Sequence, residues 1–295
     1  MNSAYVNHPP QLSIGTANFD NVYGIQKFKL SKKKIKQKIL KVILKSKIRT
    51  LDTAFDYNQS LNLFKNSNLK NYKIITKVKL PAKNIDFFLK NFENKIISKI
   101  NELEINYFDY LLLHNSDDLK IKKGQILLDK ILNLKKKKII KKIGVSIYDP
   151  KELAVVYKNF KPDLIQAPLN IFDQRLINSN LYNLMKKNNT KLQVRSIFLQ
   201  GMLLKDINEL KRMHVNKKLI NKISIFEKWC EKKKISRLEA CISFIKKIKN
   251  IKFITIGFNS DAELKQILKG FKSKKNIYFK QPSIISNQLI DPRKW

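Results

Sequence analysis

The stretch 73–114, KIITKVKLPAKNIDFFLKNFENKIISKINELEINYFDYLLLH, decides the fold. It begins and ends with a short apolar run, at 73–80 and 108–114, and each run has the length of a buried strand. Two parallel strands need a crossover connection of a dozen residues or more, which is usually a helix. The segment 86–105 meets this need, because it carries apolar residues at the four-residue steps of one helix face, namely Phe88, Phe92, Ile96 and Ile100.

The same alternation continues through the rest of the chain, with no linker rich in proline, glycine or serine to divide it. Six further apolar runs are predicted to be strands, at 11–17, 48–54, 141–147, 162–169, 192–198 and 253–258. Amphipathic segments lie between the strands, at 32–47, 122–138, 150–159, 175–188, 217–249 and 261–272. This alternation predicts an α/β fold, a (β/α)8 TIM barrel. We expect a single domain over residues 1–295, with a barrel core of about 11–272 and a C-terminal tail of 273–295.

A doubly wound open sheet is the competing fold. Its usual mark is a glycine-rich turn after the first strand. The chain has only 7 glycines, and the stretch after the first predicted strand, IGTANFDNVYG, lacks the spacing GxGxxG. The barrel is therefore the better prediction.

The composition is that of a soluble globular protein, with 43% hydrophobic and 28% charged residues. No apolar run approaches the ~20 residues needed to cross a bilayer, so no membrane insertion is expected. The first residues, MNSAYVNHPPQLSIG, lack a basic region followed by an apolar core, and we therefore expect a cytoplasmic location. The two cysteines, Cys230 and Cys241, match no metal motif. We interpret them as core thiols and predict no metal site.

The formal net charge of +38 is the most unusual feature of the composition. A surface this basic attracts phosphates, nucleic acid or anionic membranes. The lysines are spread over nearly every predicted helix, however, and the chain contains no recognised nucleic-acid module. We interpret the charge as a compositional bias on solvated helix faces and do not predict nucleic-acid binding. Polyanion binding through the basic surface stays open as an alternative.

Polar residues interrupt or end the apolar runs at the second, third and fourth predicted strands. Asp52 ends the second run and Tyr57 follows it, Lys77 lies within IITKVKL, and His114 closes YLLLH. In a barrel, the groups at the C-terminal ends of the strands carry the chemistry. A lone lysine buried there would cost several kcal/mol unless it met an opposite charge. Asp52, on the adjacent strand, is the expected partner of Lys77.

These four groups suit one kind of chemistry. A phenol has a pKa near ~10 and is a poor acid at neutral pH. A cation held beside it favours the phenolate and lowers that pKa. We therefore expect Lys77, held in place by Asp52, to lower the pKa of Tyr57, and His114 to orient a substrate oxygen by a hydrogen bond. The set would act as a general acid toward a carbonyl or alkoxide oxygen.

Asp52, Tyr57, Lys77 and His114, in this order, resemble the catalytic tetrad of the aldo-keto reductases, which are barrel enzymes that use NAD(P)H. The motifs LDTAFDY, ITK and LLLH carry the resemblance, which extends from LSIGTANF to ITIGFNS. It implies a reductase of an aldehyde or ketone with Tyr57 as the general acid. GTANFDNVYGI, NIFDQRL and RSIFLQGMLL are most similar to a branch associated with polysaccharide and sugar biosynthesis, so a sugar-derived carbonyl is one expected substrate.

The resemblance also implies a cofactor groove at the ends of the later strands. Its expected residues are Ser146 and Gln166 at the nicotinamide carboxamide, Arg195 after the seventh strand, and Gly257, Asn259 and Ser260 after the eighth. Arg195 stands where many relatives have a tyrosine. It could stack on the nicotinamide, reach a phosphate or the substrate, or form an ion pair at the barrel rim.

The preference between NADP and NAD is left open by the sequence. Glu263 stands where NADP-preferring relatives often have an arginine, and a carboxylate there would repel the 2′-phosphate, which leans toward NAD. Lys265 and Lys269 lie close enough along the chain to offset this effect.

Residues that follow the first, fourth and seventh strands are the candidates for substrate contact. They are Phe19, Tyr23, Asn115, Asp117, Phe198 and Gln200. A competing hypothesis is a barrel with weak or no turnover that keeps the cofactor as a sensor or scaffold and binds polyanions. We expect a monomer or a weak homo-oligomer, because nothing in the sequence requires more.

Overall fold

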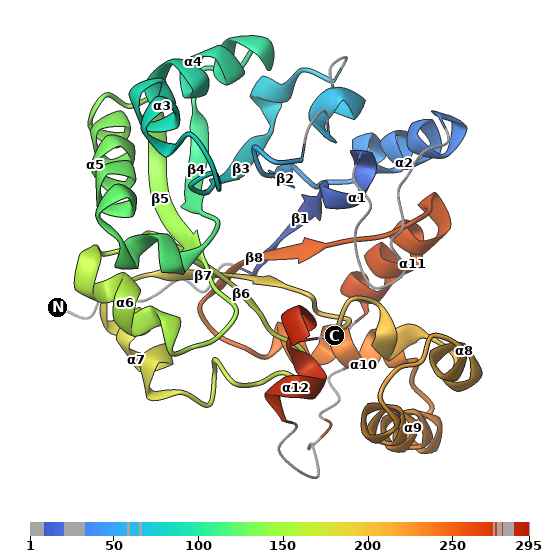
Figure 1. Cartoon of the computed structure of the whole chain (residues 1–295). Helices are drawn as coiled ribbons and strands as arrows, with labels where there is room; N and C mark the ends of the chain where they lie inside the picture. The colour runs from blue at the N-terminus through green and yellow to red at the C-terminus, as the bar shows by residue number, and fades with distance from the viewer. Residues whose placement is uncertain are drawn as a thin grey trace, which may run out of the picture.

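The computed structural model describes residues 9–20, 33–57, 60–64, 67–273, 275, 279 and 286–294. Its centre is a closed barrel of eight parallel strands, arranged in sequence order (Figure 1). The strands are β1 Gln11–Gly15, β2 Thr50–Asp52, β3 Lys73–Val78, β4 Phe108–Leu113, β5 Ile140–Ser146, β6 Leu164–Pro168, β7 Lys191–Arg195 and β8 Ile251–Ile256. The predicted (β/α)8 barrel is confirmed.

Helices surround the barrel and connect its strands (Figure 1). The first six are α1 Ala17–Asp20, α2 Lys33–Lys45, α3 Ile85–Lys90, α4 Phe92–Glu102, α5 Lys122–Lys136 and α6 Glu152–Asn159. The others are α7 Asn180–Lys187, α8 Ile207–Arg212, α9 Lys217–Lys232, α10 Arg237–Lys246, α11 Asp261–Lys272 and α12 Asn287–Ile290. Short 3-10 turns lie at Ser60–Phe64, Leu69–Asn71, Ser116–Lys120, Met202–Leu204 and Pro292–Lys294.

Two helices predicted as continuous are each divided in two. The segment 86–105 is interrupted at Asn91, which lies between α3 and α4. The segment 217–249 is interrupted after α9, where Lys234 has a left-handed φ of 50°. Ser236 then begins α10 with a capping box shared with Glu239, which satisfies backbone donors at the new helix start. The apolar periodicity continues across both breaks, and for this reason the sequence pattern did not reveal them.

Two strands, β2 and β7, end earlier than the predicted runs 48–54 and 192–198. The chain leaves β7 at Arg195 and not at Phe198, because Ser196 has a left-handed φ of 56° that no strand accommodates. Because the strand ends early, residues 196–201 form a loop at the carboxyl end of the barrel.

The interior of the barrel changes from apolar to polar along the strands. Alternate residues of each strand face inward. Five of these form a buried apolar cluster across the middle of the barrel: Ile75, Tyr110, Leu112, Leu164 and Phe253. Gly144 lies in the same region, where a Cβ would stand 2.0 Å from the Leu164 carbonyl oxygen, so no larger residue fits. The cluster closes the barrel below the polar residues at the carboxyl ends of the strands.

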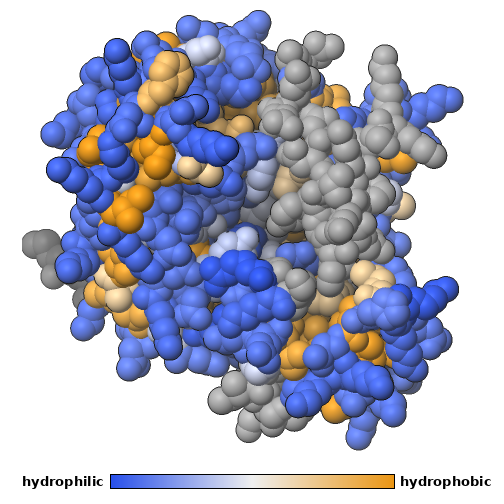
Figure 2. Space-filling view, in the orientation of Figure 1, coloured by the Kyte–Doolittle hydropathy of each residue, from blue (hydrophilic) through white to orange (hydrophobic). Residues whose placement is uncertain are grey.

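The rest of the core lies between the strands and the helices. The apolar faces of α2, α4, α5 and α9 pack there, while their other faces carry charge. Figure 2 shows that the face turned to the viewer is mostly hydrophilic, with hydrophobic residues in separate patches. Within the described residues, no helix is long and apolar enough to cross a membrane. Cys230 and Cys241 are buried and unpaired, as expected for core thiols.

Candidate active site

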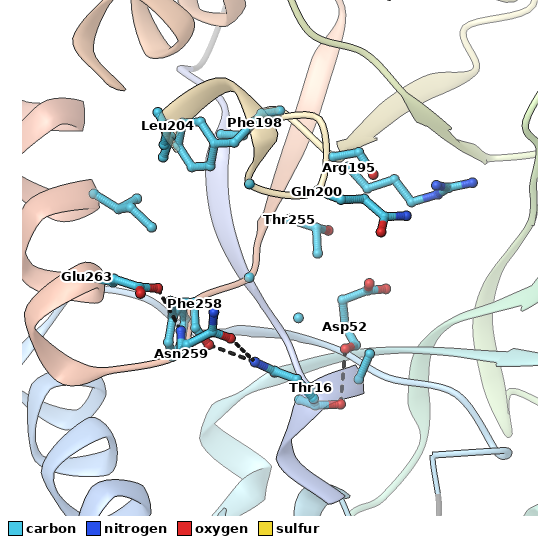
Figure 3. A pocket seen from close by; sticks show the side chains of 18 of the residues that line it. Thr16, Asp52, Arg195, Phe198, Gln200, Leu204, Thr255, Phe258, Asn259 and Glu263 are labelled. Atoms are coloured by element: carbon cyan, nitrogen blue, oxygen red, sulfur yellow. Dashed lines mark hydrogen bonds between the residues drawn. The ribbon is translucent and has the colours of Figure 1, made fainter. Parts of the chain in front are cut away.

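A cavity of about 630 Å³ opens at the carboxyl ends of the strands, and this volume is typical of small-molecule sites. The last inward residues of the strands form its floor, and the loops after β1, β7 and β8 form one wall. Figure 3 shows Phe198, Leu204 and Asn259, from the segments after β7 and β8, lying across the cavity from Asp52, while Thr16 of the loop after β1 lies beside it. All four tetrad candidates, Asp52, Tyr57, Lys77 and His114, line the cavity.

A buried ion pair between Lys77 and Asp52 lies on the cavity floor. The Lys77 Nζ is 2.8 Å from Asp52 Oδ1, and their side chains are 2% and 8% exposed. The ammonium also donates to the carbonyl of Thr53 at 2.9 Å. Gln166 Nε2 donates to the same Asp52 oxygen at 3.0 Å. These bonds offset the cost of removing both charges from water and hold the ammonium in one place.

Tyr57 and His114 face this pair from the adjacent loop and strand end. The Lys77 Nζ lies 5.5 Å from the centroid of the Tyr57 ring. The Tyr57 and His114 ring centroids are 6.1 Å apart, with an interplanar angle of 77°. A cation, a phenol and an imidazole therefore meet at one end of the cavity, as expected from the sequence.

The acidity of Tyr57 differs from the expectation. Burial raises the pKa of its phenol above the usual 10, the negative charge of Asp52 raises it further, and Arg195 lowers it only in part. The predicted lowering by Lys77 is therefore wrong for this structure. The physical reason is first the burial of the phenol, which disfavours the charged phenolate, and then the negative charge of Asp52, which offsets part of the effect of Lys77. Tyr57 consequently holds its proton across the neutral pH range.

His114 is neutral in this environment. Burial and the positive charge of Lys77 lower its pKa from 6.5 to about 4. Its Nδ1 atom is buried and has no hydrogen-bond partner among the described residues. An unsatisfied nitrogen at a cavity wall is costly unless a ligand or water meets it.

The lowered pKa of His114 predicts a pH-dependent loss of stability. Between pH 6.5 and about 4 this histidine is protonated in the unfolded chain but stays neutral in the native state. The free energy of unfolding therefore decreases as the pH is lowered through this range. At pH 5 the loss is on the order of 2 kcal/mol, and above pH 6.5 it vanishes. Urea unfolding of the parent and of His114→Gln at pH 7 and pH 5 measures it. Equal losses in the two proteins on acidification would contradict the prediction.

Arg195 is engaged within the rim of the cavity. Its guanidinium carbon lies 4.1 Å from the centroid of the Tyr148 ring, and its Nη2 donates to the carbonyl of Ile147 at 3.1 Å. Arg293, near the C-terminus, also stacks on Tyr148 at 4.3 Å, and Asp291 holds it by two hydrogen bonds. Of the roles considered for Arg195, stacking on an aromatic ring is present, but the ring belongs to the protein.

Ser146 and Gln166 occupy the centre of the cavity floor. Both are buried and line the cavity, and Ser146 Oγ lies 3.2 Å from Gln166 Oε1. With the bond from Gln166 to Asp52, they form a continuous polar chain to the ion pair. Each group keeps further hydrogen-bonding capacity, since an amide has two donors and a hydroxyl two lone pairs.

The wall formed by the β1 and β8 loops is held together by side chains. Asn18 Nδ2 donates to the carbonyl of Phe258 at 2.7 Å and to Asn259 Oδ1 at 3.2 Å. Glu263 accepts from the Asn259 backbone N–H at 2.8 Å (Figure 3). Gly257 and Asn259 line the cavity. Ser260 is not among the described lining residues; its side chain caps α11 by accepting from the Glu263 N–H.

The loop after β7 has a strained backbone. Ser196, Leu199 and Gln200 have left-handed φ values of 56°, 48° and 53°, and Gly201 follows with 91°. Each such non-glycine residue costs about 1–3 kcal/mol and persists only where the surroundings impose it. Of these four, Ser196, Gln200 and Gly201 line the cavity. Strain concentrated at a cavity is typical of ligand-binding segments.

The substrate candidates differ in their positions. Phe198 and Gln200 line the cavity, whereas Asp117 is outside the described lining and pairs with Lys120 at 2.6 Å. Phe19 is 1% exposed and packs against Phe64 and Phe258 behind the cavity wall. Asn115 is outside the described lining and caps a 3-10 turn by accepting from the Asp117 N–H. Tyr23 lies outside the described residues.

Several lining residues were not predicted from the sequence. They are Thr16, Asn18, Tyr148, Lys205, Asp206, Glu209 and Thr255. Tyr148 and Thr255 directly follow or belong to predicted strands, so the rule that strand ends carry chemistry could have included them. The residues of 205–209 reach the cavity through a loop and a short helix, for which the sequence offers no periodic signal.

Comparison with known proteins agrees with this geometry. Residues 11–279 match the model of the aldo/keto reductase family. No curated protein matches the chain. Solved structures share the fold at low identity. An aldo/keto reductase from Brucella melitensis is 20% identical, with a TM-score of 0.59 and coverage of 90% of this chain and 89% of that one.

Two further structures are similar over nearly their whole length. The glycerol dehydrogenase AKR11B4 from Gluconobacter oxydans is 16% identical, with a TM-score of 0.59 and coverage of 93% and 95% of the two chains. MGS-M4, an aldo-keto reductase from a Medee basin deep-sea metagenome library, is 18% identical, with a TM-score of 0.60 and coverage of 95% and 97%. These likenesses concern the fold, whereas the family match spans most of the sequence. The chain belongs to the aldo/keto reductase family of oxidoreductases.

Proposed function

We propose that this protein reduces an aldehyde or ketone to an alcohol with NADH or NADPH, and that Tyr57 is the general acid. The observation that carries the proposal is the convergence of the Lys77–Asp52 ion pair, the Tyr57 ring and the neutral His114 at one end of a cavity. A general acid must lie within reach of the oxygen that it protonates, and this arrangement provides a place for that oxygen.

The cavity fits a nicotinamide cofactor in its chemistry. The buried Nδ1 of His114 has no partner within the described structure. At the other side, a Cβ added to Gly201 or Gly257 would meet nothing within 4 Å, so the backbone there faces open space. Ser146 and Gln166 would hold the carboxamide, and Gly257, Asn259 and the loop containing Gly201 would hold the remainder. The bound cofactor would supply a hydride to the carbonyl carbon.

The side chains of the tetrad then divide the work on the oxygen. Neutral His114 orients the carbonyl oxygen toward the phenol. Tyr57 transfers its proton as the oxygen becomes an alkoxide, and the raised pKa does not prevent this because an alkoxide is a much stronger base than a phenolate. Lys77 stabilises the phenolate that remains, and Asp52 holds the ammonium in position.

The end of the cavity away from the tetrad, formed by the segments after β7 and β8, supports a preference for NADH. Three carboxylates line it, at Asp206, Glu209 and Glu263. The one lysine of the described lining at this end, Lys205, is ion-paired with Glu209. Lys265, which could have offset Glu263, is paired with Asp261 at 2.8 Å. A 2′-phosphate would meet a net negative charge among the described lining residues at this end.

We expect NADPH to bind about tenfold more weakly than NADH, which corresponds to about 1.4 kcal/mol. Fluorescence titration of both reduced cofactors measures the ratio. Glu263→Gln keeps an acceptor for the Asn259 N–H but removes the negative charge. It should strengthen the binding of NADPH, leave that of NADH unchanged, and so reduce the difference between the two affinities. Tighter binding of NADPH than NADH by the parent protein would refute the preference.

Turnover tests the proposal as a whole. Purified protein is expected to oxidise NADH in the presence of at least one member of a carbonyl panel that includes simple aldehydes, aldoses and ketoses. The cavity is lined by polar side chains, among them Asp52, Gln166 and Gln200, which favour hydroxylated substrates. Sugar-derived carbonyls should therefore give a higher kcat/KM than simple aldehydes. Cofactor binding without turnover on the whole panel would favour the alternative of a cofactor-binding sensor.

A further inference from the structure

The end of the barrel opposite the active site carries a ring of lysines on its inner wall. Lys73, Lys142 and Lys191 each lie four residues before a cavity-lining residue of the same strand, namely Lys77, Ser146 and Arg195. Because side chains alternate with a period of two, they face inward like those residues. Gln11 stands in the same relation to Gly15 on β1.

These four positions form one layer of the barrel. They come from β1, β3, β5 and β7, and inward residues of alternate strands share a height in a closed (β/α)8 barrel. The layer is four residues below the active-site floor, or about 13 Å along the strands. The apolar cluster with Tyr110 and Phe253 separates the two, so the lysines belong to a different site.

A fourth lysine is directed to the same place by a strand irregularity. The pairing of β7 with β8 shifts between Leu192 and Gln193, which leaves Lys252 as an extra residue in β8. A bulge of this kind re-aims a side chain. The Lys252 Nζ lies 5.8 Å from the Tyr110 ring centroid and 5.6 Å from that of Phe253, while the Lys142 Nζ lies 5.9 Å from the Tyr110 ring. We call Lys73, Lys142, Lys191 and Lys252 the cationic mouth.

The lysines of the cationic mouth have no directly paired carboxylate within the described structure. None of its four lysines forms an ion pair with a described carboxylate, although fifteen such pairs occur elsewhere. The Lys73 Nζ bonds the neutral Gln11 Oε1 at 3.2 Å.

The nearby acids are already engaged. Asp163 accepts from Lys135 at 2.7 Å and from the Ile143 N–H at 2.9 Å, and Asp109 accepts from the Ile74 N–H at 3.0 Å. The mutual repulsion is visible at Lys252, whose pKa is lowered by burial and then by Lys142, Lys73 and Lys191, while Asp163 offsets the effect only in part. These lysines therefore differ from the solvated lysines of the helix faces.

We propose that the cationic mouth binds a condensed phosphate, either free or as the phosphate chain of a nucleotide. Four ammonium groups that converge over a buried aromatic floor match an anion with three or four charges in a small volume. Such an anion would remove the repulsion between the lysines, and because it binds the folded chain it would stabilise the barrel. The proposal does not depend on the reductase activity.

The test compares two variants with the same change in net charge. Lys73, Lys142, Lys191 and Lys252 are changed to Gln in the mouth variant. Lys41, Lys90, Lys217 and Lys232, which are exposed on helices, are changed to Gln in the control variant. Calorimetric titration with sodium tripolyphosphate is expected to give one site on the parent, binding at least tenfold weaker in the mouth variant, and a change of less than twofold in the control.

Further measurements identify the ligand and check the fold. Tripolyphosphate should raise the Tm of the parent and the control but not of the mouth variant, whose own Tm should equal or exceed that of the parent because repulsion is removed. ATP competing with tripolyphosphate at similar affinity indicates recognition of the phosphate chain alone, and tighter ATP binding indicates a nucleotide; both support the proposal. If the mouth variant does not fold, Lys252→Gln replaces it, with an expected loss of at least threefold.

Two outcomes would overturn the proposal. One is equal weakening in the mouth and control variants, which would mean that tripolyphosphate binds the diffuse positive charge of the whole surface. The other is a single-stranded oligonucleotide that binds the parent more tightly than tripolyphosphate and depends on the same four lysines, which would make the mouth a nucleic-acid site.

Discussion

The variant Tyr57→Phe is expected to reduce kcat for carbonyl reduction by about 10²–10⁴-fold, the range typical of a general acid. The change removes the only proton that the phenol can supply and keeps the ring that packs against His114. Water in the cavity is a weaker and less well placed acid, so it cannot restore the rate. Steady-state kinetics with the best carbonyl substrate of the panel measures the effect.

Two controls accompany this measurement. The affinity for NADH should change by less than about twofold, because Tyr57 lies at the tetrad end of the cavity and not in the β8 loop. The far-ultraviolet circular dichroism and Tm should match those of the parent. A variant that turns over as fast as the parent would show that another group protonates the substrate oxygen.

Removing one partner of the buried ion pair should strongly destabilise the fold. Lys77→Met leaves Asp52 as an unpaired carboxylate on the cavity floor, and Asp52→Asn leaves Lys77 as an unpaired ammonium that is 2% exposed. Loss of one member of a buried pair costs about 3–5 kcal/mol. Urea denaturation at pH 7 should show this loss in each single variant, together with loss of turnover.

The double variant separates stability from catalysis. Asp52→Asn with Lys77→Met leaves no unpaired charge at these two positions, so its free energy of unfolding should lie closer to that of the parent than either single variant does. Its turnover should stay as low as in Lys77→Met, because the ammonium of Lys77 no longer stabilises the phenolate. If instead the two single losses add fully in the double variant, the pair contributes little as a pair and its assigned role is wrong.

The order of the strands and the positions of the tetrad followed from local patterns. Short apolar runs and helical periodicity recur along the chain, and these signals depend only on neighbouring residues. Polar residues at the ends of buried strands, such as Asp52 and His114, also stand out without a structure. The splitting of 86–105 and of 217–249 did not, because Asn91 and Lys234 interrupt the backbone without interrupting the apolar spacing.

The environment of each site residue was less predictable. Gln166 was expected to serve the cofactor, yet it also donates to Asp52, 114 positions away in the sequence. Arg195 was considered for the cofactor or the substrate, and it stacks on Tyr148, a ring shared with Arg293 from the far end of the chain. The pKa of Tyr57 was predicted to fall beside Lys77, but it rises, because burial of the phenol and the negative charge of Asp52 outweigh the nearby cations.

The sequence by itself determined the barrel and the identity of the four groups at its active end, since alternation and chemical type are properties of short segments. The tertiary structure alone decided which charges are cancelled and which are not. At one end of the barrel Asp52 pairs with Lys77, and at the other Lys73, Lys142, Lys191 and Lys252 lie together without a direct ion pair to any described carboxylate. Electrostatic energy depends on distance and burial, and closure of the barrel sets both by bringing together strands that are far apart in the chain.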